Sequence, residues 1–196
     1  MDYKFELMMP QFDDVEFSGI KVINEFYVKK LNDLKKTRDE FYKTRKLEGS
    51  PAYYIDHKPH YIFSDKKYLS VLSLHEMYAG GVRVSRDPEA DNFDIVTGKK
   101  ITLQDIFKSN DDIYMSKIED VLSEYLKSKD GYDEFYKHLF TTGKIKSEYN
   151  KSNFFLSDRA LTIFYDGGKL SPLNNTVFFE IPFELLNMND KTKYCR

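Results

Sequence analysis

The polar run Asp56-His57-Lys58-Pro59-His60 holds the side chains with the most obvious capacity for chemistry. Two imidazoles and a carboxylate are possible zinc ligands, so this run is a candidate metal site. The run is expected to be extended, however, and in a strand the side chains of His57 and His60 point to opposite faces. Neither paired cysteines nor a helical His-Glu-x-x-His pattern accompanies it. The sequence therefore predicts no metal site and favours a solvated strand edge.

Patterns that position a nucleophile or a phosphate are missing from the sequence. It has no Gly-x-Ser-x-Gly elbow, no Walker loop and no Gly-x-Gly-x-x-Gly run. Gly80-Gly81 and Gly167-Gly168 are too short to hold a phosphate and are expected to form turns with positive φ. The single cysteine, Cys195, lies beside the C-terminus, where a shaped pocket rarely forms. We expect no enzymatic activity and no cofactor. A hydrolase that uses His75 with a nearby serine or carboxylate is an alternative from a different functional class.

Composition indicates a folded globular protein. The 196 residues suit one domain, and 41% apolar residues with 15 Tyr and 16 Phe supply a core. Lys and Arg number 30 against 32 Asp and Glu, a net charge of −2 that argues against a nucleic-acid partner. We expect a single domain over residues 1–196, with an N-terminal lobe at 1–63 and a C-terminal lobe at 64–190.

The sequence contains no recognisable membrane span or signal peptide. Its longest apolar runs are a few residues, such as Val177-Phe178-Phe179, whereas a bilayer span requires about 20. The first residues also lack the basic and apolar regions of a secretory leader. Two interpretations stay open: a cytoplasmic protein, or an extracytoplasmic one whose targeting segment is not part of this sequence.

Hydrophobic periodicity predicts a strand at 3–9 and then a long helix from Ser18, as its N-cap, to about Leu47. The helix has one apolar face, formed by Ile20, Ile23, Tyr27, Leu31, Leu34 and Phe41. A hairpin is expected from strands at 52–63 and 68–78, joined by a polar turn. Both faces of the second strand are partly apolar, which predicts a central position in its sheet. Residues 86–91 are expected to form a polar loop.

Thr102 and Asp105 form a capping pattern for a short helix that ends near Phe107. A second long helix is expected from Asp111 or Asp112, and a third after Gly131. The expected core residues of these two helices are Ile113, Ile118, Val121, Leu122, Tyr125, Phe135, Leu139 and Phe140. Closing strands are predicted at 154–156, 160–165 and 177–181. Together the elements predict an α+β fold, a mostly antiparallel sheet packed against long helices, with 68–78 and 160–165 in the same sheet.

One ordered pattern runs from Tyr78 to Phe107. It reads Tyr-Ala-Gly-Gly, then a polar stretch, then Asn-Phe-Asp-Ile-Val-Thr-Gly-Lys-Lys-Ile-Thr-Leu-Gln-Asp-Ile-Phe. This pattern resembles that of a bacterial extracytoplasmic domain family, found in RsiV-type lysozyme-sensing anti-sigma factors and beside the deacetylase domain of PdaC-type peptidoglycan enzymes. The matching positions are Gly80, Gly81, Asn92, Asp94, Thr97, Gly98, Ile101, Leu103, Asp105 and Phe107. Weaker likeness at 9–11, 23–24 and 154–186 extends the resemblance over most of the chain.

Two departures from the family pattern bear on the ligand more than on the fold. The family's histidine after Gly-Gly-Ala is absent, since Gly81 is followed by Val82 and Arg83. The family's aromatic and proline-rich turn is replaced by residues 166–172.

The resemblance implies a non-catalytic sensor domain outside the cytoplasm, anchored to the membrane through segments absent from this chain. Its implied ligand is lysozyme or a similar basic protein, whose binding would control proteolytic release of an extracytoplasmic-function sigma factor. Contact with peptidoglycan, as an accessory to a wall-modifying enzyme, is the alternative, and stacked exposed tyrosines in a groove would favour it.

We expect the ligand to bind at the loops 79–91 and 166–175. Asp87, Glu89, Asp91 and Asp94 are expected to be solvated there and to steer a cationic partner. Asp87 and Glu89 are also expected to support no core contact. The full set of candidate ligand-binding residues is Tyr78, Gly80, Gly81, Arg83, Asp87, Glu89, Asp91, Leu170 and Pro172.

Overall fold

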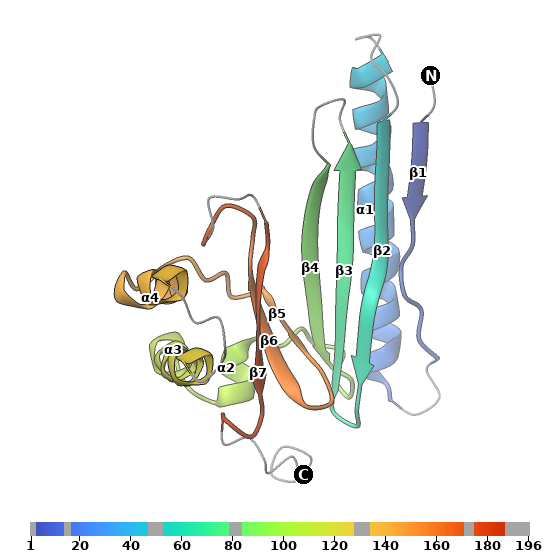
Figure 1. Cartoon of the computed structure of the whole chain (residues 1–196). Helices are drawn as coiled ribbons and strands as arrows, with labels where there is room; N and C mark the ends of the chain where they lie inside the picture. The colour runs from blue at the N-terminus through green and yellow to red at the C-terminus, as the bar shows by residue number, and fades with distance from the viewer. Residues whose placement is uncertain are drawn as a thin grey trace. The chain divides into compact units, whose positions relative to one another are not determined.

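The computed structural model describes residues 3–13, 17–46, 53–78, 84–127, 134–170 and 175–186. The chain forms two compact units (Figure 1). The first contains Met1–Glu89 and Phe93–Lys99, and the second contains Ala90–Asn92 and Lys100–Arg196. The α+β class is confirmed, with helices packed against mostly antiparallel sheets.

The first unit is built from one long helix and a four-stranded sheet in the order β1-β2-β3-β4. Its elements are α1 (Gly19–Lys46), β1 (Tyr3–Leu7), β2 (Tyr53–Ser64), β3 (Tyr68–Tyr78) and β4 (Ser85–Asp94). The β1–β2 pair is parallel, and the β2–β3 hairpin is antiparallel. The predicted hairpin, the long helix and the central position of β3 are therefore confirmed. Figure 1 shows α1 running along one face of this sheet.

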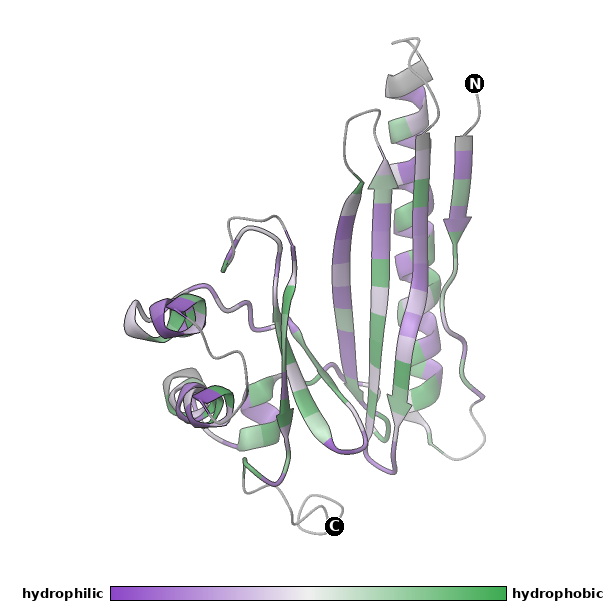
Figure 2. Ribbon diagram, viewed as in Figure 1, coloured by the Kyte–Doolittle hydropathy of each residue, from purple (hydrophilic) through white to green (hydrophobic). Residues whose placement is uncertain are grey.

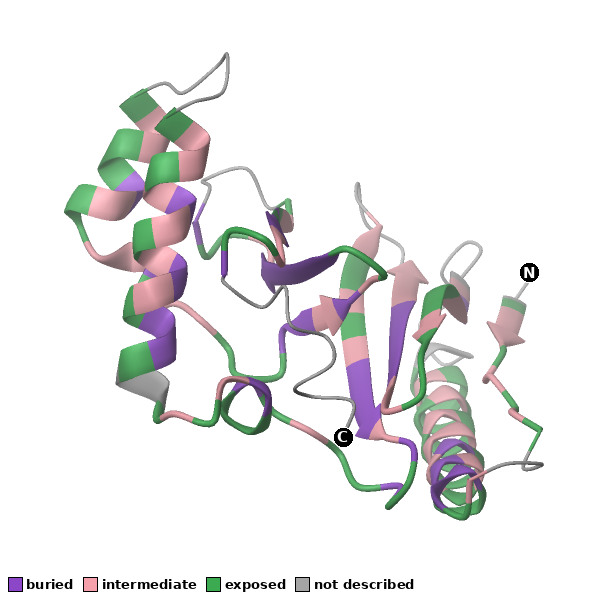
Figure 3. Ribbon diagram, turned by 90° about the horizontal axis from the view of Figure 1, so that it is seen from below, coloured by how far each residue is buried: buried purple, intermediate pink, exposed green. Residues whose placement is uncertain are grey.

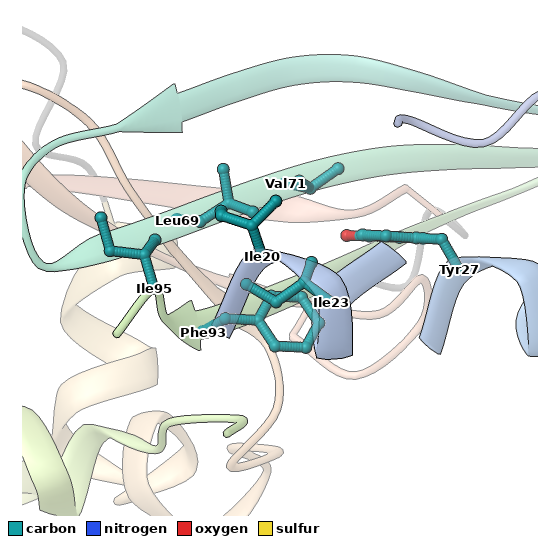
Figure 4. Packing of buried hydrophobic residues seen from close by; sticks show 7 residues of the cluster. All are labelled: Ile20, Ile23, Tyr27, Leu69, Val71, Phe93 and Ile95. Carbon is teal, nitrogen blue, oxygen red and sulfur yellow. The ribbon is translucent and has the colours of Figure 1, made fainter. Parts of the chain in front are cut away.

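The core of the first unit lies between α1 and the sheet. Ile20, Ile23 and Tyr27 recur at helical spacing on α1 and are buried against Leu69 and Val71 of β3 (Figure 4). Burying each such side chain contributes about 1.5–3 kcal/mol. The rest of the predicted apolar face of α1, towards its C-terminal end, is half-buried. Figure 2 shows that hydrophobic and hydrophilic residues alternate along this helix.

The first turn of α1 rests on the tight turn that follows β4. A Cβ on Gly19 would lie 2.3 Å from both the Gly98 nitrogen and the Ile95 oxygen, so only glycine permits this approach. Gly98 has φ +71°, a conformation that favours glycine. The turn is closed by Asp94 Oδ1, which accepts hydrogen bonds from the backbone N–H groups of Val96 and Thr97 at 3.0 and 2.8 Å. Ser18 donates its hydroxyl to the Val96 carbonyl at 3.2 Å.

The second unit combines a three-stranded antiparallel sheet with four helices. Its elements are α2 (Leu103–Phe107), α3 (Asp111–Lys127), α4 (Glu134–Thr141), α5 (Lys144–Ser147), β5 (Phe154–Leu156), β6 (Ala160–Tyr165) and β7 (Val177–Pro182). The central strand β6 is buried along its whole length, and the buried residues of α3 lie along one side of that helix (Figure 3). The predicted capping box of α2 is confirmed, since Thr102 and Asp105 each bond the other's backbone N–H. Among the described helices, none combines the length and apolar composition that a bilayer span requires.

Several expectations about packing are wrong. Residues 68–78 and 160–165 lie in different sheets, β3 in the four-stranded one and β6 in the three-stranded one. Alternation of apolar residues identifies a strand, but it carries no information on which strand becomes its neighbour. The expected boundary between lobes at residues 63 and 64 falls inside the β2–β3 hairpin, and the units divide instead near residues 89–100.

Two local expectations also fail. Residues 86–91 belong to β4 rather than to a loop, because an edge strand tolerates the charges and the proline at Pro88 that mark a loop in the sequence. Ile113 is 60% exposed, and Tyr114 and Met115 hold the buried positions at the start of α3. Further along α3, Ile118 and Leu122 are buried as expected, and Val121 and Tyr125 are half-buried.

Candidate functional site

One face of the four-stranded sheet is turned away from α1 and carries a row of polar side chains. Strand side chains alternate, and Ile55 is buried on the side of α1, so Tyr54 and Asp56 belong to the opposite side. The charged residues and the tyrosines that this face carries include Lys4, Glu6, Tyr54, Asp56, Lys58, Glu76, Tyr78 and Arg86, and Leu74, opposite Lys58, lies on the same face. They come from four strands and were not recognised as a group from the sequence.

Three carboxylates form a line across the outer face. Glu6 of β1 lies opposite Asp56 of β2, which lies opposite Glu76 of β3. Like charges in directly opposed positions repel, so each of the three requires compensation. The structure supplies it: every carboxylate in the line has a cation within reach.

The compensating cations lie on the same face. Lys58 Nζ is 2.8 Å from Asp56 Oδ2 and Arg86 Nε is 2.7 Å from Glu76 Oε1. Lys4 Nζ lies 3.5 Å from Glu6 Oε2. The hydrogen bond and charge of Asp56 raise the pKa of Lys58, and the charges of Glu6 and Glu76 add to that increase. The three acids and three bases leave this charged row close to neutral.

A stacked tyrosine pair borders this charged row. Tyr54 and Tyr78 are directly opposed, with ring centroids 6.0 Å apart and planes inclined by 23°. A depression of about 270 Å³ adjoins them and is lined by Lys4, Glu6, Tyr54, Ile55, Asp56 and Glu76. Asp56 Oδ1 is buried there and accepts no hydrogen bond within the part of the chain that the structure describes. This arrangement places an aromatic surface beside a group of carboxylates.

The two central histidines lie on the other side of the sheet. His57 is fully buried and directly opposite His75, with ring centroids 5.7 Å apart. His60 is exposed, but β2 lies between β1 and β3, so the expectation that this run is a solvated strand edge is wrong for His57. His75 Nδ1 has no hydrogen bond to a serine or carboxylate among the residues in the described ranges, and those ranges contain no group of three potential metal ligands. Neither a hydrolytic nor a metal centre gains support from this pair.

The acidic residues expected to face a ligand divide into three cases. Asp87 is exposed and accepts the Ser85 hydroxyl at 2.6 Å. Glu89 forms an ion pair with Lys30 of α1 at 2.9 Å, and the Lys30 side chain is only 12% exposed. Asp91 is 1% exposed and pairs with Lys100 at 2.7 Å. The expectation of no core contact is therefore wrong for Glu89, and the expected solvation is wrong for Asp91, because cations from other segments contact both residues of β4.

The remaining candidates have mixed outcomes. Tyr78 lies on the outer face, within the stacked pair. Leu170 is a buried core residue, which leaves little of it for a ligand to contact. Asp94 closes the turn after β4 rather than facing a partner. Gly80, Gly81, Arg83 and Pro172 lie outside the described residues.

The fold is similar to two crystal structures of DUF3298 family proteins. The protein from Pseudomonas aeruginosa aligns with a TM-score of 0.50 and 16% identity over 75% of this chain and 66% of that one. The protein from Bacteroides fragilis aligns with a TM-score of 0.51 and 18% identity over 83% of this chain and 64% of that one. The present chain thus spans less than two thirds of each. Likeness at this identity concerns the fold alone. No protein-family model and no curated protein matches the sequence.

Proposed function

We propose that this chain is a non-catalytic binding domain, the extracytoplasmic sensor end of an anti-sigma factor of the RsiV type. The observation that supports it is that residues of the sequence pattern shared with that family form defined turns, caps and hydrogen bonds in this fold. Asp94 and Gly98 build the turn under α1, and Thr102 with Asp105 caps α2. Asn92 donates a hydrogen bond to the Phe154 carbonyl at 2.7 Å within the second unit. The pattern residues thus have structural roles, which supports the resemblance of this sequence to the family.

The proposed ligand is lysozyme or a similar basic protein, as the resemblance implies. Tyr78 on the outer face and the exposed Asp87 of β4 are the described candidates for contact with it. Binding would control proteolysis near the membrane and so the release of a sigma factor, through segments outside this chain. Asp91 and Leu170 are buried and present little surface to a ligand.

A second candidate function is contact with peptidoglycan. Its support is the Tyr54–Tyr78 pair beside a polar depression, because aromatic rings with polar surroundings are common in small-molecule sites. The first candidate function requires binding of a basic protein and the second requires binding of a glycan, so direct binding measurements distinguish them.

Titration of the chain with hen-type lysozyme by surface plasmon resonance or calorimetry tests the first proposal. We expect saturable binding that weakens with salt, with cytochrome c as a basic control protein that does not bind. Absence of binding at about 100 μM, a level that detects even weak encounters, would overturn lysozyme as the ligand and favour the wall glycan.

A further inference from the structure

We propose that the depression on the outer face binds a single ring of a neutral saccharide, with the ring against Tyr54 and sugar hydroxyls donated to the carboxylates of Glu6 and Glu76. This inference rests on the proposed function only in treating the chain as a binding domain. It adds a ligand class and a site to that domain, and it does not require lysozyme as a partner.

The aromatic surface is held in place from behind. Tyr54 lines the depression, whereas Tyr78 does not line it and stacks against the Tyr54 ring from β3. Because the Tyr54 ring is already held in place, little side-chain entropy is lost when a ligand packs on it. The lower cost allows a small ligand to bind by the flat face of its ring. Aromatic side chains with an apolar body and a polar tip suit ligands that are themselves amphipathic, as sugar rings are.

Glu6 and Glu76 supply the directional contacts. Both line the depression, and their carboxylate oxygens can accept hydrogen bonds from neighbouring sugar hydroxyls. Asp56 Oδ2 is occupied by Lys58 at 2.8 Å and Oδ1 is buried out of reach of a ligand, so Asp56 holds the charged row together rather than contacting the sugar.

Charge and size narrow the ligand class. The cations Lys4, Lys58 and Arg86 match the three carboxylates in number and are paired with them. A cationic or anionic ligand would have to break one of these pairs, whereas a neutral polyol would not. The volume of about 270 Å³ lies just below the range of roughly 300–1,000 Å³ typical of drug-sized ligands. One ring fits, and the rest of an oligosaccharide would extend over the sheet.

Titration of the full 196-residue chain with the trimer of N-acetylglucosamine tests the proposal, followed by calorimetry and by NMR of the tyrosine rings. We expect a dissociation constant of about 1 mM and shifts of the Tyr54 and Tyr78 ring signals. Maltotriose shows whether the site prefers the wall sugar or accepts any pyranose. The de-acetylated, cationic trimer carries the same ring with positive charge and should bind no more tightly.

Substitutions locate the site. Tyr54→Ala and Glu6→Ala should each weaken binding by about tenfold or more, while Tyr54→Phe, which keeps the ring, should bind as the natural chain does. Tyr61→Ala is the matched control, since Tyr61 is an exposed tyrosine of β2 outside the depression. If Tyr54→Ala does not fold, the ring shifts of the unaltered chain and the Glu6→Ala variant still decide the question.

The possible outcomes separate this proposal from the previous one. No binding of any neutral saccharide at 20-fold above the expected constant, that is about 20 mM, would overturn the subsite. Equal losses in Tyr61→Ala and Tyr54→Ala would overturn it as well, as would clearly tighter binding of the cationic trimer. A chain that binds lysozyme but no saccharide leaves the sensor proposal standing without the subsite. A chain that binds the saccharide but not lysozyme supports the subsite and removes lysozyme as the ligand.

Discussion

Tyr54 lies directly opposite Tyr78 because a β-bulge at His60 shifts the register of the β2–β3 hairpin by one residue. Near the turn, Ser64 pairs with Leu69 and Tyr61 pairs with Leu72. On the side of the bulge away from the turn, Pro59 pairs with Ser73. Each residue from Pro59 back to Tyr54 therefore has a β3 partner one position earlier than a regular ladder would give. The same shift aligns the carboxylates of Asp56 and Glu76.

Deletion of His60 is expected to keep this arrangement. His60 is the extra residue of the bulge, so its removal leaves a regular ladder in which Tyr61–Leu72 and Pro59–Ser73 become successive pairs and Tyr54 still lies opposite Tyr78. The free energy of unfolding should therefore change by about 1 kcal/mol or less. Urea unfolding followed by circular dichroism measures this change.

The control for the deletion is His60→Gly, which keeps the number of residues in the strand. Because His60 is exposed and the bulge remains, this variant should differ from the natural chain by about 1 kcal/mol or less. A deletion variant less stable than His60→Gly by about 3 kcal/mol or more would contradict the assignment of His60 as the extra residue of the bulge.

The local elements of the fold could be predicted from the sequence because their causes are local. The long helix, the hairpin, the Thr102–Asp105 cap and the closing strands follow from spacing and turn chemistry among nearby residues. The pairing of β3 and β6 with different sheets depends on contacts between residues far apart in the chain, which one sequence does not reveal.

The candidate site was predicted only in part. Tyr78 was identified, but its partner Tyr54 was not. Counting back from the turn through a regular ladder would place Tyr54 opposite residue 79, and no sequence pattern announced the bulge that corrects this. The acidic residues of β4 were assigned to solvent because their partners, Lys30 and Lys100, reach them only in the folded chain.

Gly98→Ala should destabilise the first unit strongly. The residue has φ +71°, and an added Cβ would lie 2.6 Å from the Val22 Cβ and 2.7 Å from the Gly19 oxygen. Strain and overlap together should cost about 2–4 kcal/mol. Gly143→Ala isolates the strain, since Gly143 has φ +66° with no atom near the added Cβ, and should cost about 1 kcal/mol. Thermal unfolding of the two variants compares them, and equal losses would contradict the close approach of α1 to the turn.

Charge reversal separates the two exposed-edge acids of β4. Glu89→Lys places a second cation beside Lys30, whose side chain is mostly buried, and should lower the free energy of unfolding by about 1–2 kcal/mol. Asp87→Lys alters only a contact with the Ser85 hydroxyl and should change it by about 0.5 kcal/mol or less. Chemical denaturation measures both. The pairing of Glu89 with Lys30 has no energetic role if the two variants are equally stable.

Glu119→Gln should stabilise the chain at neutral pH and not at acid pH. Desolvation, aided by the charge of Asp120, raises the pKa of Glu119 above its ordinary value, although Lys146 opposes the increase. A carboxyl whose pKa is higher in the folded state holds its proton more tightly there, so its ionisation destabilises the fold above that pKa and costs nothing below the unfolded value. The melting temperature of Glu119→Gln should therefore exceed that of the natural chain at pH 7, and the difference should shrink as the pH falls below about 4, near the ordinary pKa of a glutamate. Glu124→Gln, an exposed site on the same helix, is the matched control. A gain that is the same at every pH, or that Glu124→Gln shares, would assign the effect to helix propensity rather than to the buried carboxyl.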